Sequence, residues 1–252
     1  MRPSVVRVYV GLVVLAVGLG GVGQGEAVAD GTIYWTDLGI GKIQRVNLDG
    51  TGLRDLIATD LRFPQGIAID TAGGKIYWMD SGTRKVQRAN LDGSSVEDLI
   101  TGGLSAPGAI VLDVARGKMY WTDSAIDKIQ RANLDGSGVE DLVTRGLSAP
   151  WGIALDVAGG KMYWTDAGTG KIQRARLDGT GVEDLVSRGL RIPWGIALDV
   201  AGGRMYWTDA GSDKIQRANL DGSGVEDLII TYTSGPAKGG GQRYGLALAT
   251  GR

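Results

Sequence analysis

The clearest pattern in this sequence is a short alternation of apolar and polar residues that returns at a fixed interval. One copy, in residues 152–186, contains an apolar run at 152–156 (GIALD), an aromatic segment at 161–166 (KMYWTD), and two alternating segments at 171–178 and 182–186. Glycine-rich or Asp-Gly sequences separate these segments, and such pairs favour tight hairpin turns. The pattern therefore predicts four short antiparallel strands in each copy.

The interval between copies predicts how these strands are arranged. A Tyr-Trp-Thr-Asp tetrad (once Tyr-Trp-Met-Asp) recurs every 43 residues, beginning at Tyr34, Tyr77, Tyr120, Tyr163 and Tyr206. A repeat of this length with four strands fits one blade of a β-propeller. Along the aromatic segment, Trp164 and Tyr163 point to opposite faces of the strand. A sheet with one solvent-exposed face would not carry a large aromatic residue on both faces. We therefore expect an all-β propeller whose four-stranded antiparallel blades are clamped between neighbours.

The repeat also resembles a known family, the YWTD (class B) repeats of the low-density lipoprotein receptor. The resemblance rests on the tetrad, the Lys-Ile-x-Arg that follows it, the Leu-Asp-Gly turn and the Pro-x-Gly-Ile-x-Leu-Asp segment, and it covers residues 31–249. It implies a propeller that binds protein partners on one face, near the centre. Two features of this chain depart from the family. The family normally closes six blades, whereas only five tetrads are present here. The family's receptors also carry flanking disulfide-rich modules, which this sequence lacks.

The tetrads are expected to be structural, because five copies of one carboxylate argue against a unique active site. Each aspartate is expected to bond either backbone amides or the basic residue of the adjoining strand (Arg45, Arg88, Arg131, Arg174, Arg217). The resemblance likewise implies that these positions lock neighbouring blades. The expected blade-locking residues are Trp35, Asp37, Trp78, Asp80, Trp121, Asp123, Trp164, Asp166, Trp207 and Asp209.

The two ends of the repeat region predict how the ring closes. After residue 29 the repeats begin with a second strand, and residues 245–249 (GLALA) match the inner strand at 195–199. The C-terminal strand can therefore complete the N-terminal blade, which would close a ring of five blades and remove exposed strand edges. The alternative is that the chain forms part of a six-bladed ring. The propeller domain is expected to span residues 30–252 and to be a monomer.

The first 29 residues read as a secretory signal peptide. Arg2 and Arg7 accompany an apolar run at 8–22, and Ala27-Val28-Ala29 is a small-residue cleavage pattern. An uncleaved membrane anchor is the alternative, but the run is short and interrupted by glycine. We therefore expect a secreted protein, extracellular or periplasmic, with no membrane insertion after cleavage.

Composition excludes several chemistries. The chain has no cysteine and no histidine, so thiol catalysis, cysteine-bound zinc and histidine triads are impossible. A formal net charge of −1 lacks the basic excess of a nucleic-acid-binding domain. The aspartates that end the inner strands could ring one channel mouth and hold a cation, but Ala249 interrupts that ring, and turn capping is the favoured interpretation. No metal and no cofactor are expected. The aspartates concerned are Asp70, Asp113, Asp156 and Asp199.

One position varies where the scaffold repeats are otherwise uniform, and it marks the candidate ligand site. Immediately before the glycine of each inner strand the copies carry Gln65, Gly108, Trp151, Trp194 and Tyr244. Aromatic residues clustered around the funnel are typical of recognition hot spots; the alternative is that the rings plug the channel. The expected ligand-binding residues are Trp151, Trp194, Tyr244, Gln65, Arg191, Asp127 and Asp213.

The resulting hypothesis is a secreted, non-enzymatic module that binds a protein or peptide, or else a glycan. A metal-dependent lactonase or esterase is the first alternative. It would require an asymmetric polar cluster on the inner strands, and their channel-lining positions are small and apolar. The second alternative is a structural scaffold that has no specific ligand.

Overall fold

The computed structural model describes residues 10–16 and 31–230, which form five four-stranded antiparallel sheets. Each sheet is one blade, numbered here in chain order. Blade 1 holds β1 (Val10–Ala16), β2 (Thr32–Asp37), β3 (Lys42–Asn47) and β4 (Arg54–Ile57), and blade 2 holds β5 (Pro64–Asp70), β6 (Lys75–Asp80), β7 (Lys85–Asn90) and β8 (Glu97–Ile100). Blade 3 holds β9 (Pro107–Asp113), β10 (Lys118–Asp123), β11 (Lys128–Asn133) and β12 (Glu140–Val143), with a short 3-10 helix, η1 (Val114–Arg116), after β9. Blade 4 holds β13 (Pro150–Asp156), β14 (Lys161–Asp166), β15 (Lys171–Arg176) and β16 (Glu183–Val186), and blade 5 holds β17 (Pro193–Asp199), β18 (Arg204–Asp209), β19 (Lys214–Asn219) and β20 (Glu226–Ile230).

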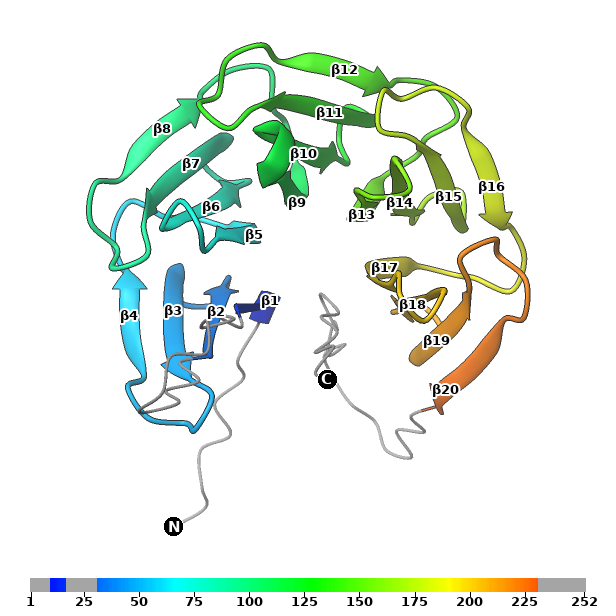
Figure 1. The fold of residues 1–252 in the computed structure, drawn as a ribbon, viewed down its shortest axis with the longest axis horizontal. Coiled ribbons are helices and arrows are strands. Elements are labelled where there is room, and N and C mark those ends of the chain that lie inside the picture. Colours follow the sequence, from blue (N-terminus) through cyan, green and yellow to red (C-terminus); the bar gives the residue numbers. More distant parts are fainter. Residues whose placement is uncertain (1–9, 17–30, 231–252) are drawn as a thin grey trace, which may run out of the picture.

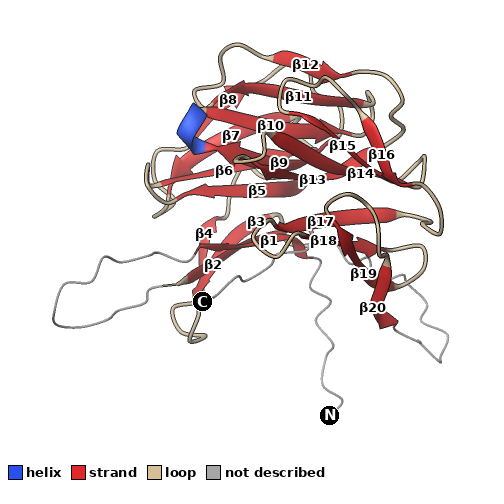
Figure 2. Ribbon diagram, turned by 45° about the vertical axis from the view of Figure 1, so that its right-hand side comes forward, coloured by secondary structure: helices blue, strands red, loops and turns tan. Residues whose placement is uncertain are grey.

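The blades stand side by side around a common centre, which confirms the predicted five-bladed propeller architecture (Figure 1). Inner strands β1, β5, β9, β13 and β17 contact one another in sequence, and the fourth strand of each blade lies at the rim. Figure 2 shows the same sheets obliquely, with loops at both ends of the strands. The described blades form an arc that is open between blade 1 and blade 5.

The inner strand of blade 1 differs from the sequence expectation. Val10–Ala16 pairs antiparallel with β2, with Val13 opposite Trp35 and Ala16 opposite Thr32. This replaces the expectation that residues 245–249 fill the position; those residues lie outside the described part of the chain. The physical reason is that the run VGLVVLA is rich in valine, a β-branched residue that favours the extended strand conformation.

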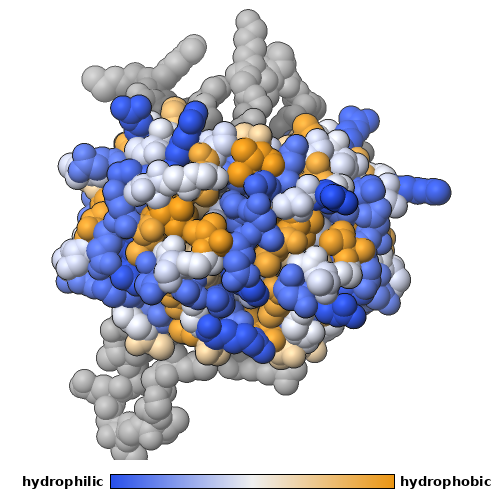
Figure 3. All heavy atoms as spheres, turned by 90° about the horizontal axis from the view of Figure 1, so that it is seen from above, coloured by the Kyte–Doolittle hydropathy of each residue, from blue (hydrophilic) through white to orange (hydrophobic). Residues whose placement is uncertain are grey.

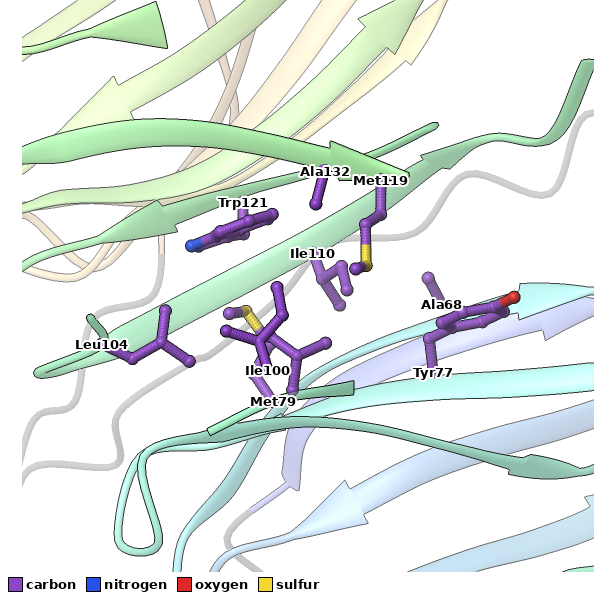
Figure 4. Close-up of a cluster of buried hydrophobic side chains, with 10 residues drawn as sticks. Ala68, Tyr77, Met79, Ile100, Leu104, Ile110, Met119, Trp121 and Ala132 are labelled. Carbon is purple, nitrogen blue, oxygen red and sulfur yellow. The ribbon is translucent and has the colours of Figure 1, made fainter. Parts of the chain in front are cut away.

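The tetrad builds the interface between successive blades. Between blades 2 and 3, Tyr77, Met79 and neighbouring apolar side chains of blade 2 pack against Met119 and Trp121 of blade 3 (Figure 4). The tryptophans of blades 2 to 5 are all 0% exposed, and each lies in an apolar cluster shared with the preceding blade. The same pairing of one Tyr face with the next Trp face recurs between all successive blades.

A hydrogen-bonded chain orients each buried indole, and sequence reasoning did not single it out. In blade 4, Trp164 Nε1 donates to Gln173 Oε1 at 3.0 Å. Gln173 Nε2 in turn donates to Asp184 at 2.7 Å, and Lys171 Nζ donates to the other oxygen of Asp184, also at 2.7 Å. The glutamine of the Lys-Ile-Gln-Arg segment therefore links the core to the charged rim, and it satisfies a buried polar group that would otherwise cost stability.

The tetrad aspartates bond backbone amides, which decides between the two expected roles. Asp80 accepts from Arg62 N at 2.7 Å and Phe63 N at 3.1 Å, and also from Gly82 N and Thr83 N at 2.9 Å. It thereby ties the loop that enters the blade to the turn after β6. The arginines of blades 1 to 4 instead lie over the tetrad tyrosines: the Arg88 guanidinium, for example, is 5.8 Å from the Tyr77 ring centroid.

The tetrad threonine joins inner strands of neighbouring blades. Thr122 Oγ1 donates to the carbonyl of Trp151 at 2.5 Å, and Thr36 Oγ1 donates to that of Gln65 at 2.6 Å. Thr165 makes the same bond to the carbonyl of Trp194. In blade 2 this position is Met79, which is 0% exposed, so an apolar thioether stands where the other blades have a hydroxyl.

The glycine of each Asp-Gly turn permits the preceding blade to come close. Gly179 has a φ of +84°, and a Cβ built there would lie 2.3 Å from the Leu142 carbonyl oxygen of blade 3. The equivalent distances at Gly93, Gly136 and Gly222 are 2.3, 2.5 and 2.3 Å. At Gly50 of blade 1 the φ is +83°, yet no atom of the described residues lies within 4 Å of such a Cβ.

Candidate ligand-binding face

The variable position before each inner-strand glycine brings two indoles together. Trp151 on β13 and Trp194 on β17 have ring centroids 4.0 Å apart and planes tilted by 40°. Both residues are half-buried. Their backbone carbonyls accept the bonds from Thr122 and Thr165 described above. Blade packing thus fixes the backbone under both rings, and the rings contact each other across the junction of blades 4 and 5.

Gln65 occupies the same repeat position in blade 2 but is engaged by its own blade. Its side chain is half-buried, and its Nε2 donates to Ser81 Oγ at 2.9 Å. Tyr244, the third expected aromatic residue, lies outside the described residues. The structure therefore brings Trp151 and Trp194 together, and it places Gln65 on the same face.

The three charged residues expected on this face are all exposed. Asp127, in the turn after β10, accepts from Ala149 N at 2.7 Å and so bridges to the loop that enters blade 4. Asp127 and Asp213 have φ values of +52° and +55°, which the turn geometry requires of both copies. Arg191 lies in the loop before β17, and its amide donates to Asp209 at 2.9 Å.

Sequence reasoning missed two exposed apolar residues of the same loops. Phe63 is 56% exposed and Ile192 is 43% exposed, and each immediately precedes the proline that begins an inner strand. Blades 3 and 4 carry Ala106 and Ala149 at this position. The signal was therefore present as a second variable position, beside the one that was followed.

The aspartates at the opposite ends of the inner strands cap turns. Gly73 N donates to Asp70 at 2.8 Å, and the corresponding bonds to Asp156 and Asp199 are 2.7 and 2.8 Å. Asp113 accepts from the Arg116 amide at 3.1 Å and pairs with its guanidinium at 2.9 Å. Within the described residues, no group of three or more acidic side chains is placed to hold a metal ion.

The rim of the propeller is covered by charge pairs that recur in each blade. Lys171 and Asp184 are 2.7 Å apart, and Arg174 and Glu183 are 2.5 Å apart. The hydrogen bond from Lys171 holds the pKa of Asp184 below its ordinary value, and the bond from Arg174 does the same for the pKa of Glu183. Figure 3 shows part of this rim, where hydrophilic columns alternate with apolar patches. No helix in the described ranges is long and apolar enough to cross a membrane.

The fold and the repeated interfaces define a propeller of the YWTD class. The chain belongs to the low-density lipoprotein receptor class B repeat family, whose profile matches residues 31–71, 74–114, 117–157, 160–200 and 203–231.

Two of the comparisons with individual proteins show similarity to nidogen. A chain in the solved nidogen/laminin complex is 31% identical, with a TM-score of 0.74, over 85% of this chain and 79% of that one. Nidogen of Drosophila melanogaster is 43% identical over 49 residues, which are 19% of this chain and 4% of the fly protein. A gluconolactonase from Xanthomonas campestris shares the fold, with a TM-score of 0.66 at 22% identity over 79% of this chain and 72% of that one.

Proposed function

We propose that this propeller is a secreted, non-enzymatic module that binds a protein or peptide on the face that carries Trp151 and Trp194. The observation that carries the proposal is the contacting, half-buried indole pair at a position that varies between otherwise uniform blades. Tryptophan is enriched among residues that dominate binding energy. The threonine bonds to both carbonyls hold the backbone beneath the rings in place, which lowers the ordering cost of binding.

The surroundings of the pair favour a polypeptide ligand. Arg191, Asp127 and Asp213 offer both signs of charge around the indoles, and Phe63 and Ile192 add exposed apolar surface on the same face. An extended chain with alternating apolar and polar side chains matches such a surface. The similarity to a chain of the nidogen/laminin complex supports a protein partner. Glycan binding remains the alternative outcome of the test below.

The binding experiment selects peptides from a phage-displayed random library on the full-length protein and measures their affinity for variants. Trp151→Ala/Trp194→Ala should weaken the selected peptides at least tenfold, because truncation of a hot-spot residue costs about 2 kcal/mol or more. The matched control is Val114→Ala/Val200→Ala, which removes two exposed apolar side chains (40% and 42%) that follow the opposite ends of inner strands. Peptides that bind the indole variant as well as they bind the valine control would contradict the proposal. Binding of the protein to a glycan array that is lost in the indole variant would contradict it too.

Secretion has its own test. Residues 1–29 are proposed to act as a signal peptide, so the protein recovered from the medium or periplasm of an expressing host should begin at Asp30. N-terminal sequencing measures this directly. Recovery of the intact N-terminus from the exported protein would contradict the proposal. Cleavage at this site would also remove the segment that contains β1 from the inner edge of β2.

The absence of catalysis is tested against the alternative of a lactonase. The gluconolactonase likeness supports the fold alone at its level of identity. Purified protein should contain no stoichiometric divalent metal and should not hydrolyse a panel of aliphatic and aromatic lactones. Turnover that depends on an added divalent ion would overturn the non-enzymatic assignment.

A further inference from the structure

Blade 1 departs from the other blades at one charged pair on its outer strands. In blades 2 to 5, the arginine of the third strand lies opposite a glutamate that begins the fourth strand, and the two side chains pair at 2.5–2.8 Å. In blade 1 the arginine of β3 is Arg45, and the residue opposite it on β4 is Arg54. Two arginines therefore face each other where each later blade joins an arginine to a carboxylate.

Arg45 lacks both of the hydrogen bonds that its counterparts make. Arg88, Arg131 and Arg174 each donate to a leucine carbonyl of the following blade at 3.1 Å, and each also donates to a glutamate of its own blade. Within the described ranges, Arg45 keeps only its contact with the tetrad tyrosine, 6.0 Å from the Tyr34 ring centroid. Arg45 is thus a half-buried cation whose outer nitrogens have no acceptor among these residues.

The acidic residues close to this arginine pair are engaged elsewhere. Asp55, the next residue of β4, is paired with Lys42. Asp92, in the Asp-Gly turn of blade 2, accepts from Ser94 N at 2.9 Å and from Ser94 Oγ at 2.6 Å. These bonds and, to a smaller extent, the charge of Arg54 hold the pKa of Asp92 below its ordinary value. Among residues 31–230, no carboxylate forms an ion pair with either arginine of the pair.

The chemistry of two facing arginines favours an anion between them. Like charges directly opposite each other on paired strands are destabilising. A guanidinium stays charged at any physiological pH, so the repulsion cannot be relieved by loss of a proton. Its planar donors match the two oxygens of a carboxylate. The later blades show that a carboxylate fits this position of the repeat, because each holds one there.

We infer that Arg45 and Arg54 form a binding site for a carboxylate side chain of an acidic peptide segment in a partner protein. The incoming carboxylate would take the place that glutamate occupies in the later blades. Leu53, immediately before Arg54, favours a peptide over a lone anion: it is 63% exposed, whereas the smaller valines at this position in blades 2 to 5 are 44–50% exposed. The site lies on the outer strands of blade 1 (Figure 1), so the inference does not rest on the proposed function at Trp151 and Trp194.

The experiment titrates the full-length protein into a labelled acidic peptide, acetyl-Gly-Glu-Leu-Glu-Gly-amide. Binding is followed by fluorescence anisotropy at low ionic strength, where exposed charges are least screened. The wild-type protein should bind one peptide, and Arg54→Gln should weaken binding about tenfold, because hydrogen bonds to charged groups contribute most among such bonds. Arg145→Gln is the matched control: it removes the same charge from another exposed arginine and should leave binding unchanged.

Two further variants use the repeat itself as a reference. Arg54→Glu gives blade 1 the arginine–glutamate pair of the later blades, so it should abolish binding and raise the melting temperature. Glu97→Arg places a second arginine opposite Arg88 in blade 2, so it should raise the number of bound peptides from one to two. Both substitutions are at exposed positions, and circular dichroism verifies that each variant is folded.

Four results would overturn the inference. The first is the lack of saturable binding by the wild-type protein. The second is an equal loss of affinity in Arg54→Gln and Arg145→Gln, which would mean that only net charge matters. The third is an unchanged stoichiometry in Glu97→Arg. The fourth comes from competition with acetate and with sulfate: displacement of the peptide by acetate at an equal concentration of carboxylate, or by sulfate at a lower concentration than acetate, would make a free anion the ligand.

Discussion

The turn glycines allow the contact between blades to be measured with a matched pair of substitutions. Gly50 and Gly179 sit in the same pentapeptide, Leu-Asp-Gly-Thr-Gly, with φ values of +83° and +84°. Both turns are closed by the same bonds, from Thr51 to Asp49 and from Thr180 to Asp178. The two glycines differ in their surroundings: a Cβ at Gly179 would meet the Leu142 carbonyl oxygen at 2.3 Å, and at Gly50 it would meet no atom of residues 10–16 or 31–230 within 4 Å.

Alanine at either position should therefore destabilise the fold by different amounts. Each variant places a Cβ in the left-handed region, at a cost of about 1–2 kcal/mol. Gly179→Ala must also displace a backbone carbonyl of the neighbouring blade, which adds about 1–3 kcal/mol, as overpacking does in cores. At about 2–4 °C per kcal/mol for a chain of this size, the melting temperature should fall by roughly 2–8 °C for Gly50→Ala and roughly 4–20 °C for Gly179→Ala.

Thermal unfolding followed by circular dichroism, with urea unfolding as the second measure, tests the difference. The informative quantity is the gap between the two variants, since the conformational cost is common to both. Equal losses would refute the reasoning, because they would mean either that blade 3 yields freely at Leu142 or that another blade covers Gly50 in solution.

The remaining predictions concern charge, burial and the threonine bond. Because the bond from Lys171 lowers the folded-state pKa of Asp184, the stabilisation is present above the unfolded pKa of ~3.9 and is lost as pH falls through the folded pKa. The melting temperature should therefore hold from about pH 7 to about pH 5 and drop below about pH 4, and Asp184→Asn should reduce that drop. Trp164→Ala should cost about 3–5 kcal/mol in urea unfolding and Trp35→Ala clearly less, since Trp164 is 0% exposed and Trp35 is half-buried; equal costs would contradict the partial exposure of Trp35. Thr165→Val should cost about 1–3 kcal/mol, because it removes the bond to the Trp194 carbonyl and the acceptor of Gly152 N, and an unchanged urea midpoint would contradict that role.

The blade architecture could be predicted from the sequence because each repeat carries its own strand and turn signals. Alternation in 161–166 placed Trp164 and Tyr163 on opposite faces, and the structure buries both in different interfaces. The Asp-Gly pairs marked real hairpin turns with positive φ. Because the tetrads recur every 43 residues without exception, an inference about the strands of one copy applies to all five copies.

The sequence could not reveal features that depend on which segments meet in space. The inner strand of blade 1 was assigned to 245–249 by repeat matching, whereas Val10–Ala16 holds that position in the structure. Its seven residues lack the Gly-Ile-Ala-Leu-Asp signature, so no repeat search would select it. The role of Gln173 was equally hidden, because a polar residue in an alternating strand reads as solvent-facing until its tryptophan and aspartate partners are known.

The candidate site was predicted in part. Variation at one repeat position led to Trp151 and Trp194, and the structure brings their rings into contact. The same reasoning overlooked Phe63 and Ile192. A proline stands between each of them and the variable position of the inner strand, so the repeat pattern assigns them to a loop rather than to the strand. Whether these side chains bind a ligand depends on chemistry that a repeat cannot encode, and the indole variants test it.

Met79 gives the junction of blades 2 and 3 a different response to cold from the other junctions. Blades 1, 3 and 4 hold the next inner strand with a threonine hydroxyl, whereas blade 2 offers a fully buried thioether. Apolar burial loses strength on cooling, so the free energy of this junction should decline more steeply at low temperature. In a repeat protein, stability is close to a sum of unit and neighbour contributions. On cooling, the packing between blades 2 and 3 should therefore be lost first, which would leave blades 1 and 2 and blades 3 to 5 as two separately packed units of one chain.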